Sequence, residues 1–136
     1  MKNMMFKYPR TIHVYETDLM GVVHHSNYLR FCEEARVAWF SKNGATSIST
    51  DEIFGLVVYE TKVQHKMPIR YGDQIEIHMQ MKVSGAKLII QYLIRNQGGV
   101  CAQAETIHCR TDRNFKVQRL EKSLIQLVEK EKWIEI

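Results

Sequence analysis

The sequence predicts an α+β fold in which one long helix lies against an antiparallel sheet of about five strands, with a second helix near the C-terminus. Three observations predict this fold. Apolar residues recur at helical spacing between residues 27 and 43, four later runs carry the pattern of strands, and turns that contain glycine separate those runs. One helix followed by several strands is typical of a helix layer packed on an antiparallel sheet.

The composition is that of one globular domain. The chain has 136 residues, of which 45% are hydrophobic and 25% are charged, and these values exclude intrinsic disorder. No repeat, low-complexity tract or proline-rich linker interrupts the chain, so we expect a single domain over residues 1–136. The formal net charge of +4 is modest and the basic residues are scattered, so nucleic acid is not an expected partner.

The cysteines and the apolar runs predict a cytoplasmic location. Cys32, Cys101 and Cys109 are odd in number and form no Cys-x-x-Cys pair, which indicates a reducing compartment. The N-terminal run Met4-Met5-Phe6 is too short for a secretory signal, and no stretch approaches the roughly 20 apolar residues of a membrane span. We therefore expect no transmembrane segment.

The first strand and the long helix are predicted on either side of a turn. Alternating apolar and polar residues predict the strand over residues 10–16. The helix is predicted over residues 27–43, with Ser26 or Asn27 as its N-cap and Gly44 as its C-terminal stop. Its apolar positions cover more than one face, which indicates a helix wrapped by a curved sheet.

Four further runs complete the predicted sheet. Because short turns separate them, we expect them to form a meander of antiparallel neighbours. The runs are Leu56–Lys66, Gln74–Val83, Lys87–Arg95 and Val100–Thr111. A C-terminal helix, packed either on its own sheet or on a partner subunit, is predicted by one apolar stripe: Leu120, Leu124, Leu127 and Val128.

Most of the functional information lies in the segment Asp18-Leu19-Met20-Gly21-Val22-Val23-His24-His25-Ser26-Asn27-Tyr28. Asp18 would lie just beyond the predicted strand, on a turn that Gly21 allows to bend. The polar residues after it open the helix, whose N-terminal N–H groups attract negative charge. The segment therefore predicts a small reaction centre. The alternative for Asp18 is a turn aspartate that only accepts hydrogen bonds from the following backbone N–H groups.

Residues 15–36 also resemble the signature of a known family. The similar segments are Tyr15-Glu16-Thr17-Asp18, Gly21-Val22-Val23, His25, Asn27-Tyr28 and Glu33-Glu34-Ala35-Arg36. They resemble the pattern of hotdog-fold acyl-CoA thioesterases of the 4-hydroxybenzoyl-CoA thioesterase type. The order of elements resembles that family over nearly the whole chain. The resemblance implies the hotdog fold, in which an antiparallel sheet wraps one long helix, and a bacterial hydrolase that converts an acyl-CoA into the free acid and CoA.

The resemblance implies catalytic roles for two residues. Asp18 would act as nucleophile or general base, and the backbone N–H of His25 would donate to the oxyanion of the tetrahedral intermediate. The residues expected to contact the substrate are Tyr15, Gly21, Val23, His24, Asn27 and Lys87. No metal or other cofactor is implied, since coenzyme A is part of the substrate. The protomers would join at sheet edges into a dimer or a tetramer, with the active site at the seam.

Two positions depart from the family pattern. Glu16 stands in place of an aspartate and His24 in place of an aromatic residue, which alters the expected acyl pocket rather than the reaction. Glu33 and Arg36 match the pattern but lie three residues apart on the helix, where an ion pair is the simpler account. Cys32 has the spacing of a core residue rather than of a nucleophile.

Other functions stay open at this point. An acyl-carrier-protein thioesterase, or a hydratase or dehydratase of acyl thioesters, would share the fold, although the histidine-and-acid pair of the latter does not match the motif around Asp18. A non-catalytic acyl-CoA-binding module would bind thioester without turnover. The acyl group and the choice between dimer and tetramer also stay open.

Overall fold

The structure, a computed structural model, describes residues 5–44 and 56–136. Its strands form one antiparallel sheet in the order β1-β3-β4-β5-β2, and the short β6 pairs with β5. The strands are β1 (Phe6–Thr11), β2 (Leu56–His65), β3 (Gln74–Ser84), β4 (Lys87–Asn96), β5 (Gly99–Thr111) and β6 (Val117–Gln118). The helices are the 3-10 helix η1 (Val14–Glu16), α1 (Ser26–Lys42) and α3 (Lys122–Glu129). The predicted α+β fold is confirmed.

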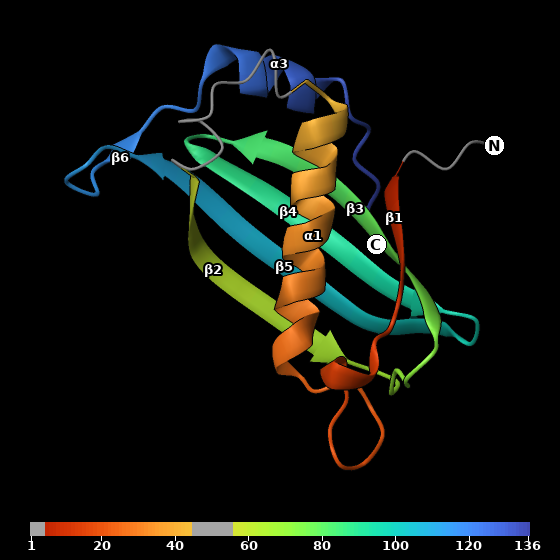
Figure 1. Cartoon of the computed structure of the whole chain (residues 1–136). Coiled ribbons are helices and arrows are strands. Elements are labelled where there is room, and N and C mark those ends of the chain that lie inside the picture. Colours follow the sequence, from red (N-terminus) through yellow and green to blue (C-terminus); the bar gives the residue numbers. More distant parts are fainter. Residues whose placement is uncertain (1–4, 45–55) are drawn as a thin grey trace.

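Helix α1 lies across one face of the sheet, which we call the inner face (Figure 1). Successive strand residues point to opposite faces, so every second residue points towards α1. The helix and the inner face share one apolar core, whose largest fully buried side chains include Phe31, Trp39, Ile77, Met79, Met81, Ile90 and Tyr92. The core explains why α1 is apolar over more than one of its faces.

The two ends of α1 lie close to the predicted positions. The helix begins at Ser26, with His25 as its N-cap. At the other end the side chain of Asn43 donates a hydrogen bond to the carbonyl of Trp39 (2.9 Å). Gly44 follows with a φ of 107°, a conformation that ends a helix and that favours glycine.

The first strand lies earlier in the chain than predicted. It spans Phe6–Thr11, and Val14–Glu16 form η1, so the prediction of a strand over residues 10–16 was wrong. The alternation of apolar and polar residues continues past the strand into the 3-10 turn. Pro9 is compatible with β1 because β1 pairs, within the described residues, with β3 alone, and the missing N–H of a proline is tolerated on an edge strand.

The predicted meander is correct only for β3, β4 and β5. Strand β2 does not pair with β3 but with the far side of β5, where His65 lies opposite Ala102. The segment between β2 and β3 is therefore a crossover rather than a hairpin. It runs past the N-terminal end of α1, where the carbonyl of Ile69 accepts a hydrogen bond from the N–H of Val23 (2.7 Å).

Helix α3 packs on its own sheet. Leu120, Leu124 and Val128 are buried in the shared core close to β3, which decides between the two alternatives for this helix. Beyond it, the backbone of Ile134 exchanges hydrogen bonds of 2.6 and 2.9 Å with the side chain of Gln80. In the described part of the chain, no helix is long and apolar enough to cross a membrane.

Candidate active site

Residues 17–23 form a loop that projects from one end of the sheet (Figure 1). Thr17 and Val23 close this loop as an isolated antiparallel bridge. Inside the bridge, the N–H of Asp18 donates to the carbonyl of Val22 (2.9 Å). The loop is therefore a small hairpin held by its own backbone, and it places Asp18 outside the core.

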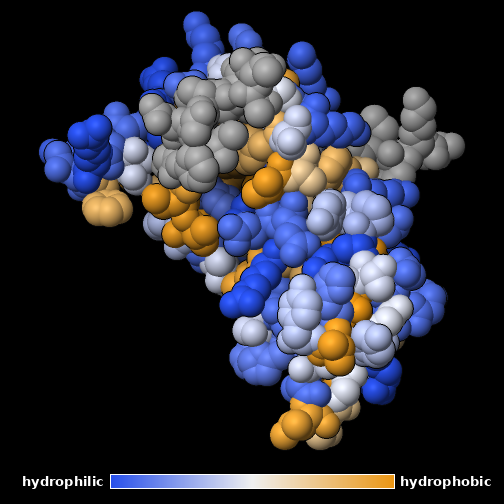
Figure 2. All heavy atoms as spheres, viewed as in Figure 1, coloured by the Kyte–Doolittle hydropathy of each residue, from blue (hydrophilic) through white to orange (hydrophobic). Residues whose placement is uncertain are grey.

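The tip of this loop is apolar and exposed. Leu19 is fully exposed and Met20 is 81% exposed, and Tyr15, just before the loop, is 78% exposed. In Figure 2 hydrophobic side chains gather at the lower tip of the molecule, where Figure 1 places the loop. Apolar side chains that remain in water in one chain are typical of a surface that another chain covers.

The carboxylate of Asp18 is held at one oxygen and free at the other. Oδ1 accepts hydrogen bonds from the N–H of Met20 (2.8 Å) and of Val22 (3.4 Å). Oδ2 has no hydrogen-bond partner among residues 5–44 and 56–136, and the side chain is exposed. Gly21, with a φ of 79°, lets the chain reverse around the carboxylate. The loop thus orients the carboxylate and leaves one oxygen able to react.

Glu16 fixes the base of the loop. It is 6% exposed, and its Oε1 accepts hydrogen bonds from Arg10 Nη1 (2.8 Å) and from the N–H of His13 (2.9 Å). Arg10 also pairs with Glu34 (2.9 Å). Burial alone would raise the pKa of the Glu16 carboxyl, but the hydrogen bonds from Arg10 and His13 outweigh it and hold the pKa below its ordinary value.

Asn27 ties this base to the first turn of α1. Its Nδ2 donates to the carbonyl of Glu16 (2.9 Å), which also accepts a hydrogen bond from the N–H of His24 (2.9 Å). Asn27 is 7% exposed, so its amide serves the interior of the protein. These contacts make Asn27 a positioning residue, and its predicted contact with substrate stays a prediction.

The N-terminal end of α1 presents a backbone donor. The N–H of Ser26 donates to His24 Nδ1 (3.2 Å), whereas the N–H of His25 has no acceptor in the part of the chain that the structure describes. The rings of His24 and His25 lie 4.3 Å apart. The His24 side chain therefore caps the helix, and the His25 N–H lies free at the positive end of the helix dipole, where it can bind an oxyanion.

The other predicted substrate contacts lie at two ends of the molecule. Tyr15, Gly21 and Val23 lie in or beside the loop, Val23 being buried. Lys87 lies at the far end of the sheet, next to the last residues of β5, and its Nζ is 4.5 Å from the centre of the Tyr59 ring. A single protomer therefore does not bring Lys87 and Asp18 together.

Four side chains form a largely buried row, of which the sequence singled out only Arg36, and that for an ion pair. Arg36 Nη1 donates to the Tyr92 hydroxyl (3.1 Å), which lies 2.7 Å from Thr106 Oγ1, and this oxygen lies 2.8 Å from His108 Nε2. We call these residues the polar row. Tyr92, Thr106 and His108 are at most 3% exposed and occupy the inner face. Thr106 and His108 follow Ala102 and Ala104 at alternate positions of one strand, the one sequence signal of the row.

Burial decides the protonation of the row. Burial, and then the positive charge of Arg36, lower the pKa of His108 to about 4. Burial raises the pKa of Tyr92 to about 12. Both groups are therefore neutral at pH 7, and Arg36 carries the one charge of the row.

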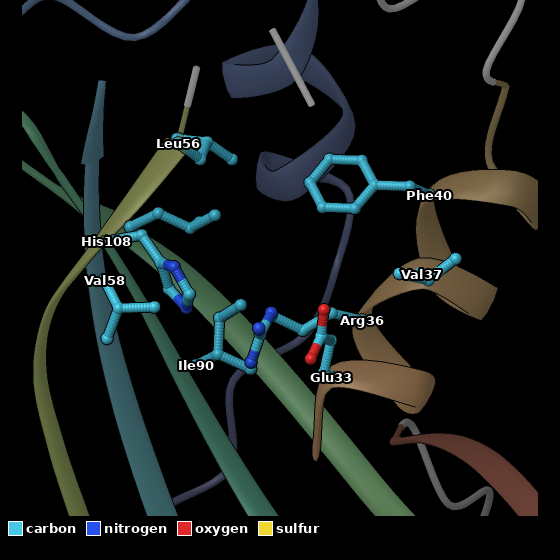
Figure 3. Close-up of a pocket in the computed structure, with 9 residues that line it drawn as sticks. Glu33, Arg36, Val37, Phe40, Leu56, Val58, Ile90 and His108 are labelled. Atoms are coloured by element: carbon cyan, nitrogen blue, oxygen red, sulfur yellow. The ribbon is translucent and has the colours of Figure 1, made fainter. Parts of the chain in front are cut away.

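The polar row borders a cavity of about 290 Å³ between α1 and the strands (Figure 3). Its polar walls are Glu33, Arg36 and His108, and its apolar walls are Val37, Phe40, Leu56, Val58, Leu88 and Ile90. In Figure 3 the His108 ring and the Arg36 side chain point into the space between strands and helix. We call this space the helix–strand cavity.

The expected ion pair on α1 is absent. Among the described residues Arg36 has no carboxylate within 4 Å, and its partner is the Tyr92 hydroxyl; Glu34, not Glu33, forms an ion pair, with Arg10. The prediction of a Glu33–Arg36 pair was wrong, because Arg36 reaches inward to the sheet. Cys32 is fully buried and its pKa is raised to about 12 by burial, in agreement with a core role.

Comparisons with known proteins point to one family. The family model of the thioesterase-like superfamily matches residues 12–127, which include both the Asp18 loop and the helix–strand cavity. The 1,4-dihydroxy-2-naphthoyl-CoA hydrolase of Thermosynechococcus vestitus is 31% identical over 105 residues, 74% of this chain and 72% of that protein. The acyl-CoA thioester hydrolase YbgC of Escherichia coli is 26% identical over 133 residues, 92% of this chain and 96% of that protein.

A solved structure extends the likeness to three dimensions. A hypothetical protein from Aquifex aeolicus superposes with a TM-score of 0.81 at 32% sequence identity, over 90% of this chain and 98% of that chain. The structural similarity therefore extends over most of the fold.

Proposed function

Because the chain belongs to the thioesterase-like superfamily and is a thioester hydrolase of the hotdog type, we propose that it hydrolyses acyl-CoA thioesters to the free acid and CoA. Relatives whose names give acyl-CoA substrates support the coenzyme A part of the proposal. An acyl carrier protein in place of coenzyme A is the alternative, and it would present the same thioester to the same residues.

One observation carries the catalytic assignment. The free Oδ2 of Asp18 and the free N–H of His25 both adjoin the bridge between Thr17 and Val23. Asp18 lies one residue inside this bridge and His25 two residues beyond it. A nucleophile or base and an oxyanion donor are therefore built on one short backbone unit, whose base is fixed by Glu16.

Two chemical routes use these groups. In the first, the Asp18 carboxylate adds to the thioester carbonyl, the C–S bond breaks with release of the thiolate, and water hydrolyses the resulting acyl-aspartyl anhydride. In the second, Asp18 takes a proton from water, the hydroxide adds to the carbonyl, and the intermediate collapses with loss of the thiolate, which then accepts that proton. Both routes place the oxyanion on the His25 N–H, a donor worth roughly 3 to 4 kcal/mol in comparable sites.

The proposed reaction needs no cofactor. A thiol has a pKa of about 8.5, so the leaving thiolate departs without a strong general acid. Coenzyme A enters only as part of the substrate. A reducing, cytoplasmic compartment remains part of the proposal, and three free, buried cysteines are compatible with it.

The proposal includes a dimer formed at the β2 edge. Within the described residues β2 pairs only with β5, and its exposed Val58 and Tyr59 leave an apolar open edge, which proteins usually cover. His65, at one end of β2, packs edge-on against Tyr28 in the first turn of α1 at 4.6 Å. If the β2 strands of two protomers pair antiparallel about a two-fold axis, the Leu56 end of β2 in one protomer lies beside the N-terminus of α1 in its partner.

This dimer would also unite residues that one protomer separates. Lys87 lies near the start of β2, because both Val57 and Lys87 are opposite Cys109. The same two-fold axis carries it towards the partner's Asp18 loop. A contact between Lys87 and the phosphates of coenzyme A is thus compatible with the dimer, as is the exposed apolar tip of the loop.

Thiol release from short, long and aromatic acyl-CoAs tests the function. We expect wild type to hydrolyse at least one class and Asp18→Asn to lose about 10²- to 10⁴-fold in kcat, the usual share of a general base. The variant should stay folded and still bind thioester. Wild-type rates in Asp18→Asn would refute the catalytic assignment. Turnover of acyl carrier protein alone would select the alternative carrier.

A further inference from the structure

The polar row and the helix–strand cavity belong together. The cavity lies beside the C-terminal half of α1, away from the Asp18 loop of its own protomer. Its volume of about 290 Å³ is roughly twice that of an engineered apolar cavity that binds benzene. The space is therefore large enough for a medium-length acyl chain. A structural network alone would not require open space beside Arg36 and His108.

The direction of the hydrogen bonds decides what the row offers to the cavity. A guanidinium only donates, so the Tyr92 oxygen accepts from Arg36. We assign the other directions so that each buried hydroxyl proton of the row has an acceptor, and the acceptor within reach of the Tyr92 proton among the described residues is Thr106 Oγ1. The Thr106 proton then goes to His108 Nε2. A neutral His108 that accepts at Nε2 carries its own proton on Nδ1. The row therefore ends in an N–H donor.

The cavity thus presents unused donors on its polar side. His108 Nδ1 has no partner among the described residues, although the residue is 3% exposed. Arg36 donates only to Tyr92, and its other N–H groups have no partner in the described part of the chain. Buried donors without acceptors are unfavourable. An acceptor supplied by a ligand would satisfy them, whereas a methyl group would not.

We propose that the helix–strand cavity receives the far end of the acyl group and selects acyl groups that end in an oxygen acceptor, a hydroxyl or a carboxylate, over plain alkyl groups. This inference rests on the proposed function for its reaction, but its binding step does not. In the proposed dimer, the Leu56 end of β2 borders this cavity and lies beside the partner's loop. The acyl chain would run from the partner's Asp18 into the cavity. Arg36 and His108 are then specificity-determining residues.

A matched series of eight-carbon substrates tests the selection. We compare kcat/KM for octanoyl-CoA, 8-hydroxyoctanoyl-CoA and the mono-CoA thioester of octanedioic acid. At least one of the two oxygen-bearing substrates should exceed octanoyl-CoA in kcat/KM by about tenfold or more, because an alkyl end leaves the buried N–H donors unpaired. Preference for the carboxylate would point to the charge of Arg36, and preference for the hydroxyl to the neutral donor of His108. Equal values for all three substrates would overturn the proposal.

Substitutions separate selection from a structural role. In His108→Leu and Arg36→Met the ratio of oxygen-bearing to alkyl substrate should fall towards one, and His108→Gln, which keeps an N–H donor, should restore part of it. Gln91→Leu is the matched control, because Gln91 bridges Gln80 and Glu105 in a similar partly buried row on the outer face. It should leave the ratio unchanged. An unchanged ratio in both His108→Leu and Arg36→Met would overturn the proposal.

Two further measurements cover other outcomes. If the cavity variants do not fold, Val37→Trp narrows the cavity from the exposed side of α1. The ratio of kcat/KM for octanoyl-CoA to that for acetyl-CoA should then fall by about tenfold, and an unchanged ratio would overturn the proposal. If no acyl-CoA is hydrolysed, calorimetry with octanoic, 8-hydroxyoctanoic and octanedioic acids decides. Tighter binding of an oxygen-bearing acid that His108→Leu abolishes would uphold the cavity while the proposed reaction fails. Equal or absent binding would overturn it.

Discussion

The loops that begin at Asp18 and at Asp112 have the same local structure. In both, the aspartate N–H donates to the carbonyl four residues later, at 2.9 and 3.0 Å, and the aspartate carbonyl accepts from the N–H three residues later, at 3.0 Å in each. In both, Oδ1 accepts from the N–H groups two and four residues later. The third residue after the aspartate has a positive φ in each loop, 79° and 62°.

The surroundings of the two loops differ. The Asp112 loop joins β5 to β6, and Oδ2 of its aspartate accepts a hydrogen bond from the Gln118 amide (3.4 Å). The Asp18 loop leads instead into α1, whose first free N–H lies two residues beyond the loop, and it stands on a buried carboxylate. An aspartate turn therefore does not by itself predict a reaction centre. The helix end and the fixed base distinguish the Asp18 loop, which we propose as the catalytic one.

The matched variants Asp18→Asn and Asp112→Asn should differ in kcat, and this is the largest effect that we expect. Asn keeps the Oδ1 acceptor in both loops, so the free energy of unfolding should change by less than about 0.5 kcal/mol in each. Only Asp18→Asn should lose activity, by about 10²- to 10⁴-fold in kcat. Thiol release and thermal melts of both variants measure this. A comparable rate loss in Asp112→Asn would show that the turn, rather than its surroundings, matters.

Arg10→Met tests the fixed base that only the Asp18 loop has. It leaves Glu16 and Glu34 without their shared cation, and we expect a loss of about 2 kcal/mol in the free energy of unfolding, since one partner of a shielded pair remains. Urea unfolding measures it. Lys62→Met is the control, because the Lys62–Glu60 pair is exposed and should contribute less than about 0.5 kcal/mol. Equal losses would mean that Arg10 acts as a surface residue.

Substitutions at the two positive-φ positions should change the free energy of unfolding in opposite directions. Gly21→Ala places a side chain at a φ of 79°, where nothing else obstructs it, and should cost about 1 kcal/mol from the backbone alone. Phe115→Gly removes an exposed side chain at a φ of 62° and should stabilise by up to about 1 kcal/mol. Both are read from denaturant midpoints. Changes of the same sign would contradict the shared geometry of the loops.

Acid should weaken the fixed base of the Asp18 loop, and this is the smallest expected effect. The pKa of Glu16 is lowered on folding, despite burial, by its hydrogen bonds from Arg10 and His13. Its contribution is therefore present above the ordinary glutamate pKa of about 4.3 and is lost as pH falls below it. Melting temperatures at pH 7 and pH 3.5 should differ less in Glu16→Gln than in wild type. An unchanged pH dependence would exclude this role of Glu16.

Local rules predicted most elements and the candidate residues, but not their partners. The helix over residues 27–43, the later strands and the Asp18 turn follow from spacing, glycine positions and charge, which act over a few residues. The pairing of β2 with β5 did not follow, because a short turn favours neighbours and a crossover depends on the whole sheet. The predicted Glu33–Arg36 pair failed for the same reason, since helix spacing does not reveal that Tyr92 lies opposite.

The sequence by itself determined the type of each main element, the turn that holds Asp18 and the family resemblance, because these depend on contacts within a few residues and on a contiguous motif. It did not determine the position of the first strand. Only the tertiary structure decided that Asn27 and Glu16 fix the loop, that Lys87 lies away from Asp18, and that Arg36 and His108 face one cavity. These contacts and placements involve residues that lie up to dozens of positions apart in the sequence. Packing of a helix on a sheet sets such contacts, and no local pattern encodes them.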